Sequence, residues 1–148
     1  MAPKQIEREV VIAAPVERVW AALTEAEHIG AWFGDAGAEI DLRPGGTLVI
    51  KWKEHGAYHT TIERIDPPRF FSWRWTYTAG EDPRPDNSTL VEFSLTPEGD
   101  GTRLRVVESG FHTLNMPEEQ RAQRAAENTQ GWREELEELR QYVQRPAA

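Results

Sequence analysis

The sequence predicts an α+β fold in which an antiparallel sheet wraps around one long C-terminal helix. Three observations predict it: a run of strand-like segments joined by short turns, six tryptophans in 148 residues, and an amphipathic pattern from about Pro117 to Val143. A sheet followed by a helix of that length can enclose a space. The aromatic residues indicate that this space holds apolar groups.

The composition favours one globular domain over residues 1–148, with its core at about 5–143. The apolar fraction of 39% is too high for a disordered chain. No apolar run approaches the roughly 18 residues that span a bilayer, and the charged N-terminus lacks the apolar region of a signal peptide. With no cysteines, we expect a cytoplasmic protein without membrane insertion. A net charge of -8, with scattered lysines and arginines, argues against a nucleic-acid partner.

The N-terminal part of the chain predicts a strand and two short helices. Ile6–Ala13 begins with the alternation of a strand, and Pro15 suits the first turn of a following helix. One face of that helix is apolar, with Val16, Val19, Trp20 and Leu23. Thr24 and Glu27 have the spacing of a capping box and predict a second helix that ends at Gly34.

Glycine- and proline-rich turns divide the middle of the chain into strands. The expected strands are Glu39–Leu42, Thr47–Lys53, Ala57–Ile65, Phe70–Thr78, Thr89–Thr96 and Arg103–Ser109. Because most of the turns between them are short, neighbouring strands are expected to pair antiparallel. The longer segment Ala79–Asn87, with two prolines and several charges, is expected to form an exposed, mobile loop.

The C-terminal segment shows the clearest periodicity. Apolar or small residues recur at three- and four-residue steps: Ala122, Ala125, Thr129, Trp132, Leu136, Leu139 and Val143. Gly131 lies in the middle of this pattern, where glycine costs about 1 kcal/mol relative to alanine. We expect it to permit the close approach of a strand or a side chain.

Alternation along each strand predicts which side chains face the helix. The inward set comprises Leu48, Ile50, Trp52, Tyr58, Thr60, Ile62, Phe71, Trp73, Trp75, Tyr77, Val91, Phe93, Leu95, Leu104, Val106 and Glu108. Glu108 is a carboxylate in an apolar layer and therefore needs a partner. Arg64, His59 and His112 are candidates; alternatively, Glu108 reaches water or an arginine at the strand end, or anchors a ligand.

Most kinds of catalytic site find no support in the sequence. The four histidines lack metal-ligand spacing, and no glycine-rich phosphate loop precedes a helix, so neither a metal nor a cofactor is expected. Acid–base chemistry stays open, because Glu108, His112 and Tyr58 are able to transfer protons if they meet in one cavity.

Several short motifs follow one another along the chain. They are Ala14-Pro15 with Val19-Trp20-Ala22-Leu23, Trp32-Phe33-Gly34, Arg43-Pro44-Gly45-Gly46, Ile65-Asp66-Pro67-Pro68-Arg69, Glu108-Ser109-Gly110-Phe111, and Gly131-Trp132 with Leu136 and Leu139. From about Gln5 to Val143 the chain resembles the START-like helix-grip (SRPBCC) superfamily, and within it bacterial homologues of the activator of heat-shock protein 90 ATPase. The resemblance implies a curved sheet that grips the C-terminal helix, with a cavity between them. Relatives bind lipids and other hydrophobic molecules, and a few catalyse cyclisation or hydrolysis.

The first hypothesis is therefore that the chain binds a small hydrophobic or amphipathic ligand. The expected ligand-binding residues are Trp32, Phe33, Tyr58, Ile62, Phe71, Trp73, Trp75, Phe93, Leu104, Glu108, His112 and Trp132. A second hypothesis is a protein-interaction role, with a chaperone in a stress response or as a homodimer, through exposed Trp32 and Trp52. A third is a cyclase- or hydrolase-type enzyme that uses Glu108 or His112.

Overall fold

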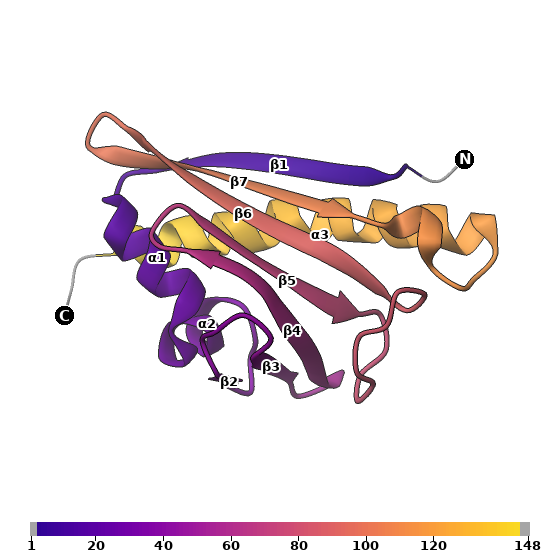
Figure 1. Ribbon diagram of the computed structural model, residues 1–148. Coiled ribbons are helices and arrows are strands. Elements are labelled where there is room, and N and C mark those ends of the chain that lie inside the picture. The colour runs from indigo at the N-terminus through magenta and orange to yellow at the C-terminus, as the bar shows by residue number, and fades with distance from the viewer. Residues whose placement is uncertain (1–2, 146–148) are drawn as a thin grey trace.

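The computed structural model of the chain describes residues 3–145. It confirms the α+β class: a seven-stranded antiparallel sheet curves along the long C-terminal helix (Figure 1). The strands are β1 (Gln5–Ile12), β2 (Ala38–Ile40), β3 (Thr47–Trp52), β4 (Gly56–Asp66), β5 (Phe70–Thr76), β6 (Ser88–Glu98) and β7 (Gly101–Ser109). Their order is β1-β7-β6-β5-β4-β3-β2, so β2 to β7 lie in chain order and β1 pairs with the last strand.

The helices lie at one end and along one face of the sheet. They are α1 (Val16–Thr24), α2 (Ala26–Trp32), a 3-10 turn η1 (Phe111–Thr113) and α3 (Glu118–Gln144). The 27-residue α3 confirms the expected long helix. The capping box is wrong: Thr24 is the last residue of α1, and its hydroxyl donates to the Trp20 carbonyl at 2.8 Å. Glu25 is the only residue between the two helices, so it takes the N-cap position of α2.

The expected inward faces of the strands are confirmed. Phe71, Trp73 and Phe93 are at most 1% exposed and pack against one another. From α3, four apolar side chains complete this core: Trp132, Leu136, Leu139 and Val143. On β4 the register with β5 shifts between Ile62 and Arg64. Such an irregularity bends a strand and increases its twist, which helps the sheet to curve around the helix.

Candidate functional site

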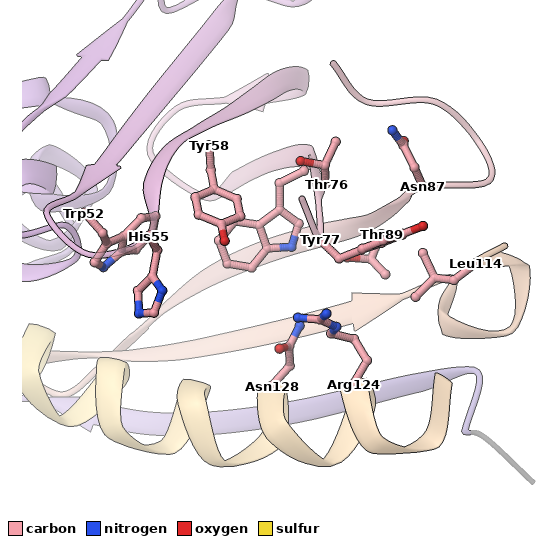
Figure 2. Close-up of a pocket in the computed structure, with 11 residues that line it drawn as sticks. Trp52, His55, Tyr58, Thr76, Tyr77, Asn87, Thr89, Leu114, Arg124 and Asn128 are labelled. Carbon is pink, nitrogen blue, oxygen red and sulfur yellow. The ribbon is translucent and has the colours of Figure 1, made fainter. Parts of the chain in front are cut away.

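A cavity of about 220 Å³ lies between the β3–β5 part of the sheet and the N-terminal half of α3 (Figure 2). We call it the main cavity. It is lined by Trp52, His55, Tyr58, Trp75, Thr76, Tyr77, Asn87, Thr89, Leu114, Arg124 and Asn128. Trp52, Tyr58 and Trp75 are only half-buried, in contrast to the closed core beside them.

Its two sides differ in chemistry. The sheet contributes aromatic rings: Trp52 meets Tyr58 edge-on, with 5.4 Å between ring centroids. The helix contributes Arg124 and Asn128, one turn apart, and Figure 2 shows both side chains rising from α3 toward the rings. The cavity therefore offers aromatic surface on the sheet side, beside the hydroxyls of Thr76 and Thr89, and polar groups from α3. Such a lining suits an amphipathic molecule.

A smaller cavity of about 100 Å³ adjoins the main cavity, with which it shares Trp52, Trp75 and Asn128. We call it the side cavity; its other lining residues are Phe33, Gly131, Trp132 and Glu135. The expected close approach at Gly131 is wrong, because a Cβ atom built there meets nothing within 4 Å. The missing side chain instead leaves open space beside the aromatic rings.

Glu108 on β7 connects the sheet to α3 through hydrogen bonds from Trp75, Thr89, Asn128 and Trp132. We call these five residues the Glu108 cluster. Glu108 itself is 0% exposed. Its Oε2 accepts hydrogen bonds from Trp75 Nε1 at 2.8 Å and Thr89 Oγ1 at 2.5 Å. Its Oε1 accepts one from Trp132 Nε1 at 2.9 Å, and Asn128 Nδ2 donates to both oxygens at 3.0 and 3.1 Å. Four neutral side chains from three elements therefore converge on one carboxylate.

The partners expected for Glu108 from the sequence are wrong. Arg64 and His59 lie near Asp66 and Asp82 instead, each at 3.9 Å. His112 is exposed in η1. Glu108 itself reaches neither water nor an arginine, and it does not line the main cavity. It acts on the cavity indirectly, because Trp75, Thr89 and Asn128 are both its donors and lining residues.

Glu135 borders the side cavity on α3. Its Oε2 is buried without a hydrogen-bond partner. Burial, together with the nearby charges of Glu138 and Glu134, raises the pKa of Glu135 to about 8. The carboxyl group is therefore largely protonated at neutral pH, and it can donate a hydrogen bond into the side cavity.

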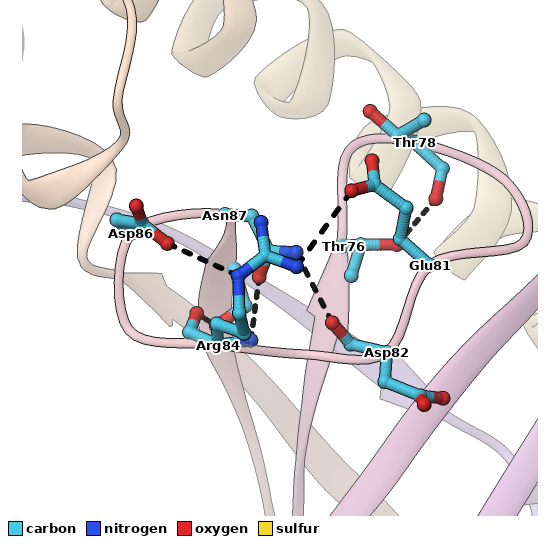
Figure 3. Close-up of polar contacts among 8 residues, drawn as sticks. Thr76, Thr78, Glu81, Asp82, Arg84, Asp86 and Asn87 are labelled. Carbon is cyan, nitrogen blue, oxygen red and sulfur yellow. Dashed lines mark hydrogen bonds and ion pairs between the residues drawn. The ribbon is translucent and has the colours of Figure 1, made fainter.

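The segment before β6, Ala79–Asn87, contributes Asn87 to the lining of the main cavity. As expected, most of this loop is exposed, and polar contacts around Arg84 connect its residues to one another (Figure 3). The Arg84 guanidinium lies 3.7 Å from the Glu81 carboxylate and 3.5 Å from that of Asp86. The backbone N–H of Arg84 donates to Asn87 Oδ1. Asn87 Nδ2 donates in turn to the Asp82 carbonyl at 3.1 Å. Asn87 is thereby held in place as a lining residue.

The structure separates the sequence-predicted ligand residues other than Glu108 into four groups. Tyr58 and Trp75 line the main cavity, and Phe33, Trp75 and Trp132 line the side cavity. Those that are buried in the core without lining either cavity are Trp32, Ile62, Phe71, Trp73, Phe93 and Leu104. His112 lies on a separate cavity with Lys4 and Arg74. Glu108, His112 and Tyr58 therefore do not meet in one cavity.

Several residues that line the main cavity are missing from the predicted ligand-binding set. Trp52 and Tyr77 belonged to the predicted inward faces, so that alternation did carry their signal. Arg124 and Asn128 carried none, since each resembles the solvated polar residues around it in α3. Within residues 3–145, no group of three His, Asp or Glu side chains is arranged to hold a metal ion. The same part of the chain contains no helix that is both long and apolar enough to cross a bilayer.

The profile of the family described as "Activator of Hsp90 ATPase homolog 1-like protein" matches residues 13–144. The chain belongs to this family. Its helix-grip architecture, with a cavity between sheet and helix, fits ligand binding. No curated protein matches the chain.

Solved structures share the fold over nearly the whole chain. Protein MLL2253 from Mesorhizobium loti is 24% identical, with a TM-score of 0.79 over 97% of this chain and 99% of that one. CalU16 from Micromonospora echinospora is 28% identical, with a TM-score of 0.71 over 95% and 76%. The Aha1 dimer from Colwellia psychrerythraea is 20% identical, with a TM-score of 0.73 over 94% and 95%.

Proposed function

We propose that this protein binds a small hydrophobic or amphipathic molecule in the main cavity. The observation that carries the proposal is a local contrast in packing. Phe71, Trp73 and Phe93 fill the core and are at most 1% exposed, whereas Trp52 and Trp75 leave ring surface open to the cavity. When an apolar ligand covers such ring surface, the complex is stabilised by about 25 cal/mol per Å² of apolar surface removed from water.

The Glu108 cluster supports the same proposal. It fixes Trp75 from the sheet and Asn128 from α3, so the two sides of the cavity are held in place before a ligand arrives. A preformed site avoids the entropy of ordering side chains on binding. The side cavity extends the apolar surface beyond Trp75, toward Phe33 and Gly131.

The proposal is tested with N-phenyl-1-naphthylamine, a neutral aromatic probe whose emission rises in apolar surroundings. We expect saturable binding to the wild-type protein and at least ten-fold weaker binding to Trp52→Ala. Trp20→Ala is the matched control, because Trp20 is also partly buried but packs edge-on against Phe71 and lines neither cavity. Equal affinity in Trp52→Ala and the wild type would place the probe elsewhere and contradict the proposal.

A second candidate function is a protein-interaction role, with a chaperone or a second copy of this chain as partner. The family description and the dimeric Colwellia psychrerythraea relative favour it. Trp32 cannot form such an interface, since it is 3% exposed and its Nε1 donates to the Ala22 carbonyl at 2.7 Å. Light scattering across a concentration series tests self-association, and a steady monomer mass would remove the homodimer.

A further inference from the structure

Arg124 is the charged side chain that α3 places in the main cavity. It is half-buried, and its guanidinium lies over the ring of Tyr77, 5.6 Å from the ring centroid. Figure 2 shows it beside Asn128, facing the aromatic side of the cavity. The Tyr77 ring supports a cation in this position but leaves the N–H groups of the guanidinium available.

Arg124 lacks the carboxylate partner that two other arginines of α3 possess. Arg121 pairs with Glu118, and Arg140 pairs with Glu137. Within residues 3–145, no carboxylate lies within 4.0 Å of the Arg124 guanidinium. Among the described residues, its guanidinium is therefore held over the Tyr77 ring without the carboxylate that pairs with Arg121 or Arg140.

The composition of the cavity lining points the same way. The chain has 25 Asp and Glu residues and a net charge of -8, yet none of the eleven described lining residues is acidic. Glu108 does not line the cavity, and hydrogen bonds from four side chains occupy both of its carboxylate oxygens. Nothing in the described lining therefore competes with a ligand for the guanidinium.

We propose that the ligand of the main cavity carries an oxyanion, such as a carboxylate or a sulfonate, that pairs with Arg124. Its apolar part then lies against Trp52, Tyr58 and Trp75. The planar fork of a guanidinium matches two oxygens of such a group, which gives geometric selectivity as well as charge. This inference rests on the proposed function, and it adds the chemical class of the ligand.

The test compares two probes that share an apolar frame. N-phenyl-1-naphthylamine is neutral, and 1-anilinonaphthalene-8-sulfonate adds a sulfonate to the same rings. We expect Arg124→Gln to weaken the sulfonate at least ten-fold while it leaves the affinity for the neutral probe within two-fold. Arg124→Lys keeps the charge but loses the fork, so an intermediate loss is expected. The matched control is Arg133→Gln, which removes an equal charge from an exposed position of α3.

Each outcome separates this inference from the proposed function. If both probes bind and Arg124→Gln affects them equally, the oxyanion site is wrong but the cavity still binds ligands. If neither probe binds the wild-type protein, both proposals fail. Unchanged binding of the neutral probe in Arg124→Gln also shows that the variant is folded. Competition by decanoate but not by decanol would extend the result to carboxylates, and equal competition would contradict it.

Discussion

Replacing Glu108 by glutamine should destabilise the fold, although the two side chains have nearly the same shape. Glutamine keeps one carbonyl oxygen and puts an NH₂ donor where the second carboxylate oxygen stood. The indole N–H of Trp75 donates to one oxygen of Glu108 and that of Trp132 to the other. Whichever way the amide lies, one indole N–H must then face another donor.

The magnitude follows from the identity of the donors. The Thr89 hydroxyl can rotate and accept a hydrogen bond from the new NH₂ group, whereas an indole N–H can only donate. The amide is therefore expected to place its nitrogen beside Thr89 and to leave Trp75 Nε1 unpaired. A buried unpaired donor costs about 1–3 kcal/mol. Loss of the buried charge offsets part of this cost, so we expect a net loss of about 1 kcal/mol.

A double-mutant cycle measures the effect without the charge term. Trp75→Phe removes the N–H group, so it should cost about 1–3 kcal/mol less in the Glu108→Gln background than in the wild type. Urea unfolding followed by far-ultraviolet circular dichroism gives each free energy. Trp20→Phe should be additive with Glu108→Gln, because Trp20 has no contact with the carboxylate. Additive costs for Trp75→Phe, and equally for Trp132→Phe, would refute the reasoning.

Two further predictions concern the side cavity. Because the pKa of Glu135 is raised from 4.5 to about 8, its charged form is disfavoured in the fold, and stability decreases as the pH rises from 4.5 to 8. The full shift corresponds to about 5 kcal/mol, which solvent access reduces to about 2 kcal/mol. In urea unfolding, Glu135→Gln should therefore be about that much more stable than the wild type at pH 8.5 but not near pH 4.5, and a gain independent of pH would contradict this. Gly131→Ala should raise the unfolding free energy by about 1 kcal/mol, because its Cβ enters open space. A lower urea midpoint for this variant than for the wild type would contradict that expectation.

The sequence predicts the fold well because its signals are local and repeated. The alternation in Phe70–Thr78 fixes which rings point inward, and the helical period of α3 fixes its apolar face. Phe71 and Trp73 are buried as the alternation predicts, although Ser72 and Thr76 at the alternate positions are buried as well. The apolar face of α3 is buried at Ala125, Trp132, Leu136, Leu139 and Val143. The boundary between α1 and α2 was harder to predict, because Thr24 has the composition of a cap but its hydroxyl finds an acceptor within α1.

The candidate site was predicted only in part, because inward direction does not decide which side chains are left uncovered. Trp73 and Trp75 lie on the same face of β5, but Trp73 is covered by the core and Trp75 opens to the cavity. Their difference depends on what α3 places opposite. It presents Asn128 and Gly131 near Trp75. Asn128 resembles the polar residues around it in the sequence, and Gly131 stands out but predicted a close approach rather than open space. The partners of Glu108 are likewise distant in sequence.

One carboxylate links the stability of this fold to the shape of its cavity. Glu108 joins β7, β5, β6 and α3 through Trp75, Thr89, Asn128 and Trp132. A variant that breaks this cluster should therefore lose stability and alter both sides of the cavity at once. Arg124 lies outside the cluster, so its replacement should change ligand choice and leave the unfolding free energy nearly unchanged. Variants of Glu108 therefore test what determines the shape of the cavity, and variants of Arg124 test what determines which ligand it binds.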